Sequence, residues 1–191
     1  ARHHISKLRI NPYRNIEFTT DEIGSINRGC NRHFESDRKF HNWAVFVQLS
    51  QEATDTIRES GDKDMDRDFF ISHILIELLL DKVILDIEPK IADNLYKMID
   101  SVEMDWILKY LRYSGLQDDE LFKGNHRRFM KAGFLRKYTS IENVVEMVAQ
   151  VAIRTGINEL NDDQKGLLVE ICETLEPQLK RSLDQLELQL L

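Results

Sequence analysis

The stretch FFISHILIELLLDKVIL, residues 69–85, decides the fold class. Read at the helical period, it is apolar on nearly every side, which is typical of a helix enclosed by other helices. It is not a membrane span, because polar residues such as His73, Glu77 and Lys82 break the run well short of the roughly 18 to 20 apolar residues that a bilayer requires. Pro89 then ends this helix and opens the next. We therefore predict a helix that is enclosed within a helical protein.

Apolar residues at three- and four-residue spacing predict helices along the rest of the chain. The expected helices cover about residues 20–42, 43–60, 69–85, 91–100, 104–113, 118–133, 139–155 and 161–191. The first two can also form one long helix, and Pro177 can break, kink or restart the last one. The expected fold class is therefore all-α, with a single domain of seven or eight helices over residues 19–191 after a basic N-terminal arm over residues 1–18.

Two capping boxes mark expected helix starts. In each of them a threonine precedes a glutamate by three residues, Thr19 with Glu22 and Thr139 with Glu142. These side chains can satisfy the free amides of a first helical turn. We therefore expect helices to begin at these two threonines.

The composition disfavours several functional classes. The 191 residues include 42% hydrophobic and 31% charged residues but only 8 Gly and 3 Pro, which favours an ordered helical chain over a disordered or many-stranded one. The net charge of −7 disfavours binding to duplex nucleic acid. The two cysteines, Cys30 and Cys172, offer neither a disulfide framework nor a CxxC motif, so we expect a cytoplasmic protein. The glycines are scattered singly, which excludes NTPases and Rossmann dehydrogenases.

Three polar residues in the first expected helix recur at four-residue steps. His33, Asp37 and His41 therefore share one face of that helix. Apolar side chains fall on the same side of the helical wheel: Ile23, Ile26, Cys30, Phe34 and Phe40. We expect this polar stripe to point towards the interior.

The helix over residues 69–85 repeats this arrangement with His73, Glu77 and Asp81. An ionised carboxylate among leucines and isoleucines costs several kcal/mol unless it is paired or bound to a cation. Imidazole with carboxylate is a ligand set for Zn²⁺, Mn²⁺ or Fe, and a set without thiolates favours a catalytic site over a structural one. We therefore predict a divalent metal cofactor, with Mn, Fe or Zn as the candidate ions.

The two stripes together provide the candidate metal ligands, which are His33, Asp37, His41, His73, Glu77 and Asp81. Asp37 and Glu77 are the middle members of their stripes and lie at the same level if the stripes face each other, so they are the candidate catalytic residues. One ion can take a pair from each helix, or two ions can share the stripes through a bridging carboxylate. His41 lies near His73 if the two helices are antiparallel, whereas His33 lies near His73 if they are parallel.

Two stretches carry a resemblance to a known family. INRGCNRHFESDRKFHNW, residues 26–43, resembles a helix of acyl carrier protein phosphodiesterases in which His and Asp stand four apart and a further Asp and His follow. DFFISHIL, residues 68–75, is similar to that family's second motif, an Asp followed after three residues by an Asp-His pair. The match covers His33, Asp37, Asp68 and His73, with His41 in addition. Ser72 stands where the family has the Asp of the pair, and Glu77 one turn later can supply a carboxylate instead.

The resemblance implies both a fold and a reaction. The family is a distant relative of the HD-domain phosphohydrolases, so an HD-domain-like helical bundle and metal-dependent phosphodiester hydrolysis are expected. The four-residue His-Asp and His-Glu pairs are also similar to zinc-dependent phospholipase C and its nuclease relatives, which implies the same reaction class. Asp68 is then expected to support the metal ligands or to bind a second ion.

A basic segment, KGNHRRFMKAGFLRKY over residues 123–138, stands out in this acidic chain. Arg127, Arg128 and Lys131 within it are the candidate substrate-binding residues, because Arg and Lys recognise phosphate groups. An acidic carrier protein is a candidate partner for the same segment. The alternative is a solvated helix face whose basic side chains cover neighbouring phenylalanines.

The sequence thus predicts a metal-dependent hydrolase of a phosphodiester or phosphomonoester, in which a divalent ion promotes deprotonation of water near neutral pH. The alternative is a non-catalytic helical interaction module whose His, Asp and Glu stripes form a buried polar network. Ser72 favours this alternative, because it replaces a ligand that the resemblance leads us to expect. A third hypothesis is a helical bundle that binds metal for redox or thiol chemistry.

Overall fold

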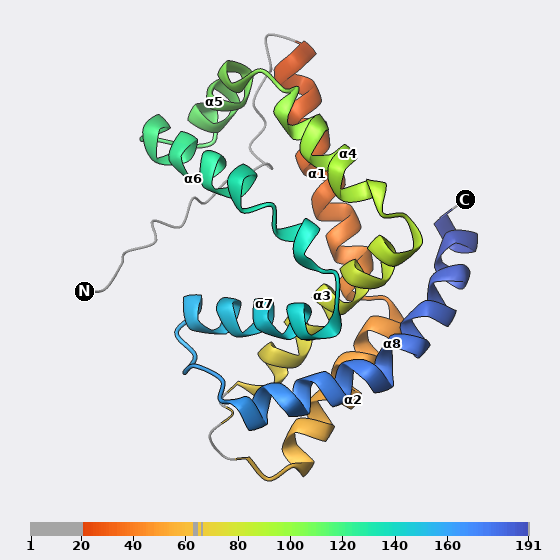
Figure 1. The fold of residues 1–191 in the computed structure, drawn as a ribbon. Coiled ribbons are helices and arrows are strands. Elements are labelled where there is room, and N and C mark those ends of the chain that lie inside the picture. The colour runs from red at the N-terminus through yellow and green to blue at the C-terminus, as the bar shows by residue number, and fades with distance from the viewer. Residues whose placement is uncertain (1–20, 63–64, 66, 191) are drawn as a thin grey trace. The chain divides into compact units, whose positions relative to one another are not determined.

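The computed structural model describes residues 21–62, 65 and 67–190, with side chains up to residue 183. Within these residues the regular secondary structure is entirely helical, with eight α-helices and one short 3₁₀ helix (Figure 1). The elements are α1 (Asp21–His41), α2 (Ala44–Glu59), α3 (Asp68–Ile87), α4 (Lys90–Asp100), α5 (Met104–Tyr113), α6 (Asp119–Ala132), η1 (Phe134–Lys137), α7 (Ile141–Arg154) and α8 (Asp162–Leu190). The all-α prediction is confirmed.

The described residues form two compact units. The first unit contains residues up to Lys39 together with Leu95–Ala132, and the second contains Phe40–Asn94 together with residues from Gly133 onward. The long helix α1 and the shorter α4 therefore each contribute to both units. The single domain over residues 19–191 stays a prediction, and the basic arm over residues 1–18 lies outside the described residues.

The second unit is built around α3, which corresponds to the helix predicted over residues 69–85. It packs against α2, α7 and α8, and its residues Leu75, Leu79 and Val83 are completely buried (Figure 1). The two ends of α3 differ from its middle, because Phe69 and Ile87 are exposed. The expectation of an enclosed helix is thus confirmed for the middle of α3, and its exposed ends bear on the site described below.

α2 is a separate helix from α1. The chain leaves α1 after His41, and Trp43 has the extended backbone angles φ −68° and ψ 122° that precede a new helix. The stripe predicted to be buried on α2, which is Phe46, Leu49, Ala53 and Ile57, is indeed buried. This break decides between the two alternatives that the sequence leaves open.

The first unit has a smaller core. Ile23 of α1 and Tyr110 and Leu111 of α5 are buried there, and Cys30 packs against them. The Tyr110 hydroxyl donates a hydrogen bond to Asn27 Oδ1 at 3.1 Å. Burial raises the pKa of Tyr110 to about 12, and its contact with Cys30 adds to the shift. This core holds the N-terminal half of α1.

The helix starts correct one prediction. Ser140, not Thr139, caps α7, because its hydroxyl accepts a hydrogen bond from the backbone N–H of Asn143. Thr139 Oγ1 instead accepts from the Asn143 side chain at 2.9 Å. Both hydroxyl residues stand close to the helix start, and the one whose backbone is extended directly before it becomes the cap. The other predicted capping box, at Thr19, lies outside the described residues.

α8 starts with a reciprocal capping box that was not among the predicted ones. Asn161 Oδ1 accepts from the Gln164 backbone N–H at 2.9 Å, and Gln164 Oε1 accepts from the Asn161 N–H at 3.0 Å. Pro177 lies inside α8 and does not end it. Of the three outcomes open for Pro177, a break and a restart are therefore excluded.

An ion-pair network around the buried Lys82 connects α3 to α8. Lys82 Nζ donates to Asp86 Oδ2 at 2.8 Å and to Glu176 Oε1 at 2.9 Å, and Glu176 also pairs with Lys180 at 3.0 Å. These contacts provide the Lys82 ammonium group with two carboxylate partners. These ion pairs hold this part of α3 against α8.

Candidate metal centre

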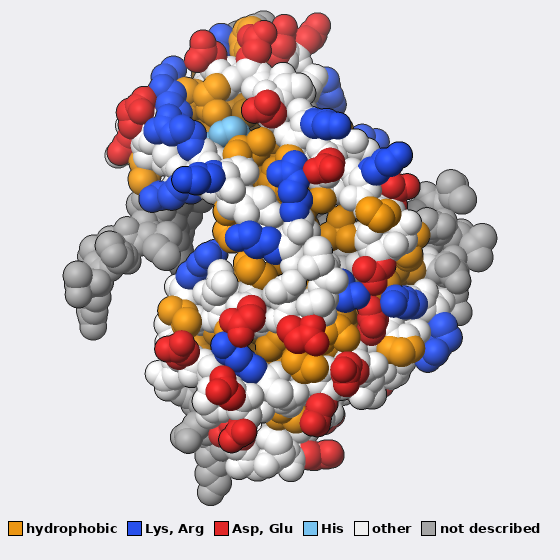
Figure 2. Space-filling view, in the orientation of Figure 1, with side chains coloured by type: hydrophobic (Ala, Val, Ile, Leu, Met, Phe, Trp, Pro, Cys, Tyr) orange, Lys and Arg blue, Asp and Glu red, His pale blue; other side chains and the backbone are white. Residues whose placement is uncertain are grey.

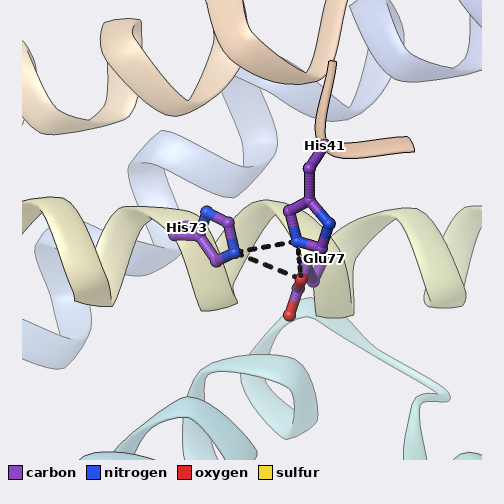
Figure 3. Close-up of side chains that lie close together, drawn as sticks. All are labelled: His41, His73 and Glu77. Carbon is purple, nitrogen blue, oxygen red and sulfur yellow. Dashed lines mark hydrogen bonds and ion pairs between the residues drawn. The ribbon is translucent and has the colours of Figure 1, made fainter. Parts of the chain in front are cut away.

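Three of the predicted ligands come together in the second unit. His41 is the last residue of α1, whereas His73 and Glu77 lie one turn apart on α3 (Figure 3). His41 Nε2 lies 3.2 Å from His73 Nε2 and 3.0 Å from Glu77 Oε1. His73 Nε2 lies 3.3 Å from the same Glu77 oxygen. Among the described residues this is the group of His, Cys, Asp and Glu side chains whose spacing suits one metal ion.

The spacing of these three atoms matches one face of a coordination shell. Ligand atoms held at about 2.1 Å from one ion lie about 3.0 Å apart in octahedral and about 3.4 Å apart in tetrahedral geometry. The observed separations of 3.0, 3.2 and 3.3 Å fall within this range. These three atoms could therefore hold one divalent ion, which would supply further coordination positions for water or a substrate.

The three side chains are partly open to solvent. The exposed fractions are 30% for His41, 25% for His73 and 30% for Glu77. Structural zinc sites use four protein ligands and are closed, whereas catalytic sites use three and keep an open position. Both the number of ligands and their exposure therefore match the catalytic type.

An aromatic side chain from α2 holds the two imidazole rings. The Phe46 ring, which is only 3% exposed, lies 5.4 Å from the His41 ring and 5.1 Å from the His73 ring, nearly perpendicular to both. The two imidazole rings are parallel within 8°. The Phe40 ring, 5.3 Å from His41, packs against Phe46 as well. The spacing predicts Phe46 only as part of the core stripe of α2, and it does not identify the contact of Phe46 with both histidines.

Asp81 lies one turn beyond Glu77 on α3 and outside this group of three. Burial raises the pKa of Asp81 to about 6, and the negative charge of Glu77 adds to the shift. Asp81 is therefore a carboxylate in an environment that disfavours its charge. Its role as a metal ligand stays a prediction.

His33 and Asp37 belong to the first unit, so the structure does not place them relative to His73 and Glu77. Both residues are exposed, and Phe34 between them is exposed as well. The expectation that the whole stripe on α1 points inward is thus wrong for its first two members. His41, at the end of the same stripe, is partly buried by the aromatic rings of the second unit.

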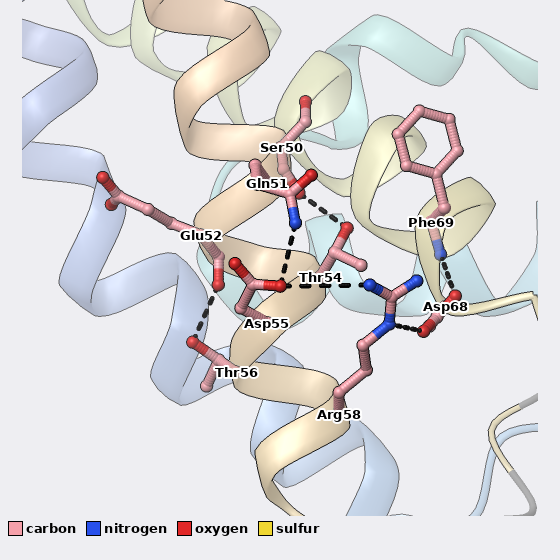
Figure 4. Close-up of polar contacts among 9 residues, drawn as sticks. All are labelled: Ser50, Gln51, Glu52, Thr54, Asp55, Thr56, Arg58, Asp68 and Phe69. Carbon is pink, nitrogen blue, oxygen red and sulfur yellow. Dashed lines mark hydrogen bonds and ion pairs between the residues drawn. The ribbon is translucent and has the colours of Figure 1, made fainter.

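Asp68 is occupied by contacts of its own. Its Oδ2 accepts a hydrogen bond from Arg58 Nε at 2.5 Å, and its Oδ1 accepts from the backbone N–H of Phe69 at 2.6 Å (Figure 4). The bond from Arg58 is the main cause that lowers the pKa of Asp68. The structure thus shows Asp68 fixing the first turn of α3, while its predicted support of the metal site stays a prediction.

Ser72, which stands at the position of an expected aspartate, is completely buried. Its hydroxyl has no hydrogen-bond partner in the described part of the chain. A hydroxyl enclosed in this way cannot reach an ion at the partly exposed histidines. The carboxylate in the group of three is that of Glu77, and its replacement of the expected aspartate as a metal ligand stays a prediction.

The predicted substrate-binding residues lie on α6 in the first unit. Arg127, Arg128 and Lys131 line a shallow hollow of about 410 Å³, and Figure 2 shows the Lys and Arg side chains that gather over α6. All three are exposed, and Arg128 donates a hydrogen bond to Asn125. The basic patch therefore exists, and its function is untested.

Comparison with models of protein families, with curated proteins and with solved structures finds no match for this chain. None of the helices in the described residues combines the length and the apolar character that crossing a membrane requires. Function is therefore inferred from the geometry of the site.

Proposed function

We propose that this protein is a metal-dependent hydrolase of phosphoesters, either diesters or monoesters, and that His41, His73 and Glu77 hold its divalent ion. One observation carries the proposal: three ligand atoms from two separate helices lie within 3.3 Å of one another in a partly open site. Two imidazoles and a carboxylate suit Zn²⁺, Mn²⁺ or Fe²⁺.

Each side chain has a defined task in this proposal. The imidazoles supply uncharged nitrogen ligands, and Phe46 keeps both rings in place. Glu77 supplies the negative charge through Oε1, and its second oxygen can accept a proton from the water that attacks phosphorus. When bound, a divalent cation supplies Lewis acidity, because it lowers the pKa of water and neutralises the charge that develops on the phosphoryl group.

The other predicted residues have supporting roles in the proposal. They are His33, Asp37 and Asp81 as further ligands, Asp37 also as a second catalytic carboxylate, Asp68 as support, and Arg127, Arg128 and Lys131 as the site for a substrate phosphate or an acidic carrier protein. The resemblance to acyl carrier protein phosphodiesterases supports this assignment, and the basic character of α6 suits an anionic substrate. A cytoplasmic location is part of the same proposal.

Metal analysis tests the proposal directly. Protein purified without chelators should contain close to one equivalent of Zn, Mn or Fe for each ion site. The double variant His73→Ala Glu77→Ala should lose this metal, with affinity lowered by more than about a hundredfold, since losing two ligands costs more than losing a supporting contact. Matched controls are His126→Ala and Glu52→Ala, which remove a histidine and a glutamate outside the group. Both controls should retain the metal.

The same variants distinguish the alternative, a helical interaction module with a polar network. In that case the double variant would lower the free energy of unfolding while the wild-type protein binds no metal and hydrolyses no phosphoester in its presence. The buried hydroxyl of Ser72 is the observation that favours this alternative. The partial exposure of His41, His73 and Glu77 favours the hydrolase.

A further inference from the structure

An exposed aromatic ring stands beside the candidate metal centre. Phe69 is 58% exposed, and its ring centroid lies 6.2 Å from that of His73, with an angle of 40° between the rings. Phe69, His73 and Glu77 follow one another at four-residue steps, so they lie on one face of α3. The ring thus borders the metal ligands at one end of that face.

Polar contacts hold the backbone of Phe69 in place. Its N–H donates to Asp68 Oδ1 at 2.6 Å, and Asp68 Oδ2 accepts from Arg58 Nε of α2 at 2.5 Å (Figure 4). Arg58 also lies 3.9 Å from Asp55 on its own helix. The first turn of α3 is therefore fixed to α2. The exposed ring thus stands on a helix start that polar contacts hold in place.

We propose that Phe69 contacts the substrate and selects phosphoesters that carry a planar aromatic group, such as an aryl ring or a nucleobase. This inference rests on the proposed hydrolase function, because the phosphoryl group is taken to lie at the metal ligands. An exposed phenyl ring offers a face for stacking, and stacking of a base on an aromatic side chain makes a substantial contribution to binding. Phe69 is the aromatic ring next to His73 whose surface is mostly free for such a contact, whereas Phe46 is buried.

The distance between the Phe69 ring and the His73 ring suits this substrate class. A ring centroid 6.2 Å from the His73 ring is within the span of a phosphoryl group and the planar group esterified to it. An aliphatic ester would gain apolar contact with Phe69 but no stacking. Replacing Phe69 by Leu therefore separates the two classes, since leucine keeps apolar surface and removes the aromatic face.

Binding of two phosphonates to the metal-loaded protein tests the inference without turnover. Phenylphosphonate and ethylphosphonate carry the same charged group, their C–P bonds resist hydrolysis, and calorimetric titration gives a dissociation constant for each. In Phe69→Ala we expect phenylphosphonate binding to weaken about five- to fiftyfold and ethylphosphonate binding to change less than about twofold. Phe69→Leu should behave like Phe69→Ala, and Phe69→Trp should bind phenylphosphonate as tightly as the wild type.

A matched control and a kinetic measurement complete the test. Ile87→Ala removes another exposed apolar side chain, at the far end of α3, and should leave both dissociation constants unchanged. With phenyl and ethyl phosphate esters as substrates, Phe69→Ala should raise KM for the phenyl ester alone and leave kcat within about twofold. Each variant is compared with the wild type on the same ester, so the different reactivity of the two leaving groups cancels.

The outcomes are distinct. Equal binding of phenylphosphonate by the wild type and Phe69→Ala overturns the role of Phe69 while metal binding and hydrolysis still support the proposed function. Retained binding by Phe69→Leu overturns the aromatic class and assigns the contact to an aliphatic group. A wild-type protein that binds no metal overturns both the inference and the function on which it rests.

Discussion

Replacing Asp81 by Asn is expected to stabilise the metal-free protein above pH 6. Asp81 lies in a largely buried position next to Glu77, and its pKa is raised from 3.8 to about 6. In the unfolded chain the same carboxyl ionises near its ordinary value. Folding at neutral pH therefore places a charge where the structure disfavours it, and an asparagine of the same shape avoids this cost.

The pKa shift sets the size of the effect and its direction with pH. The change from 3.8 to about 6 corresponds to about 3 kcal/mol at most, and the partial exposure of Asp81 reduces this to about 1–2 kcal/mol. Between pH 4 and 6 the folded state binds more protons than the unfolded state, so the contribution of Asp81 to stability falls as pH rises through this window. The free energy of unfolding of Asp81→Asn should thus be higher than that of the wild type by this full amount at pH 7, and only slightly higher at pH 4.

Urea unfolding followed by circular dichroism, with chelator present and pH varied from 4 to 8, measures this difference. Asp55→Asn, at an exposed position on α2, is the control for the loss of one carboxylate and should not reproduce the gain in stability at pH 7. Saturating Zn²⁺ should reduce the advantage of Asp81→Asn, because the cation offsets the charge of Glu77. The reasoning is refuted if Asp81→Asn is no more stable than the wild type at pH 7, or if the difference is the same at pH 4.

Three further predictions follow from the contacts around α3. Phe46→Leu should weaken zinc binding about tenfold, because it frees both imidazole rings, and equilibrium titration with a competing chelator measures this; unchanged affinity would show that the ring is only a packing residue. Zn²⁺ at a hundred times its dissociation constant should raise the free energy of unfolding by about 2.7 kcal/mol, an effect that His73→Ala should abolish in a thermal melt. Lys82→Met should lower the free energy of unfolding by about 3 kcal/mol, because it leaves the largely buried Glu176 carboxylate with Lys180 as its remaining partner. Adding Glu176→Leu should recover part of this loss, which urea titrations measure. A second substitution that only adds to the destabilisation would contradict the pairing of Lys82 with Glu176.

The helices could be predicted well because their signals are local. Apolar spacing and the few Gly and Pro residues identify the elements, and the structure places their ends within a few residues of the expected positions. The predicted cap of α7 is one residue away from the observed one. Thr139 and Ser140 both offer a hydroxyl, and the backbone angles of Ser140 make it the cap. Pro177 could not be assigned from the sequence, because a proline inside a helix and a proline at a helix start leave the same pattern.

The candidate site could be predicted only where its residues are neighbours on one helix. His73 and Glu77 are one turn apart, so their proximity follows from the helical period. The pairing of His41 with His73 was one of two alternatives, and tertiary packing selected it. For His33 and Asp37 the helical wheel was misleading, because it assumes that one face of α1 is buried along the whole length of the helix. Apolar residues near the start of α1, such as Ile23, are covered in the first unit, whereas the wheel extends that cover to positions that are exposed.

The separation of His41 from His73 along the chain has a consequence for folding. The two ligand atoms lie 3.2 Å apart in space but 32 residues apart in sequence, and the whole of α2 lies between them. A cation held by both residues would act on the folded chain as a removable cross-link that closes this loop. For a loop of that length the chain-entropy estimate for a cross-link is about 3–4 kcal/mol. Loading the ion would therefore hold the end of α1 on α3 in the folded protein, and stripping the ion would remove that tether.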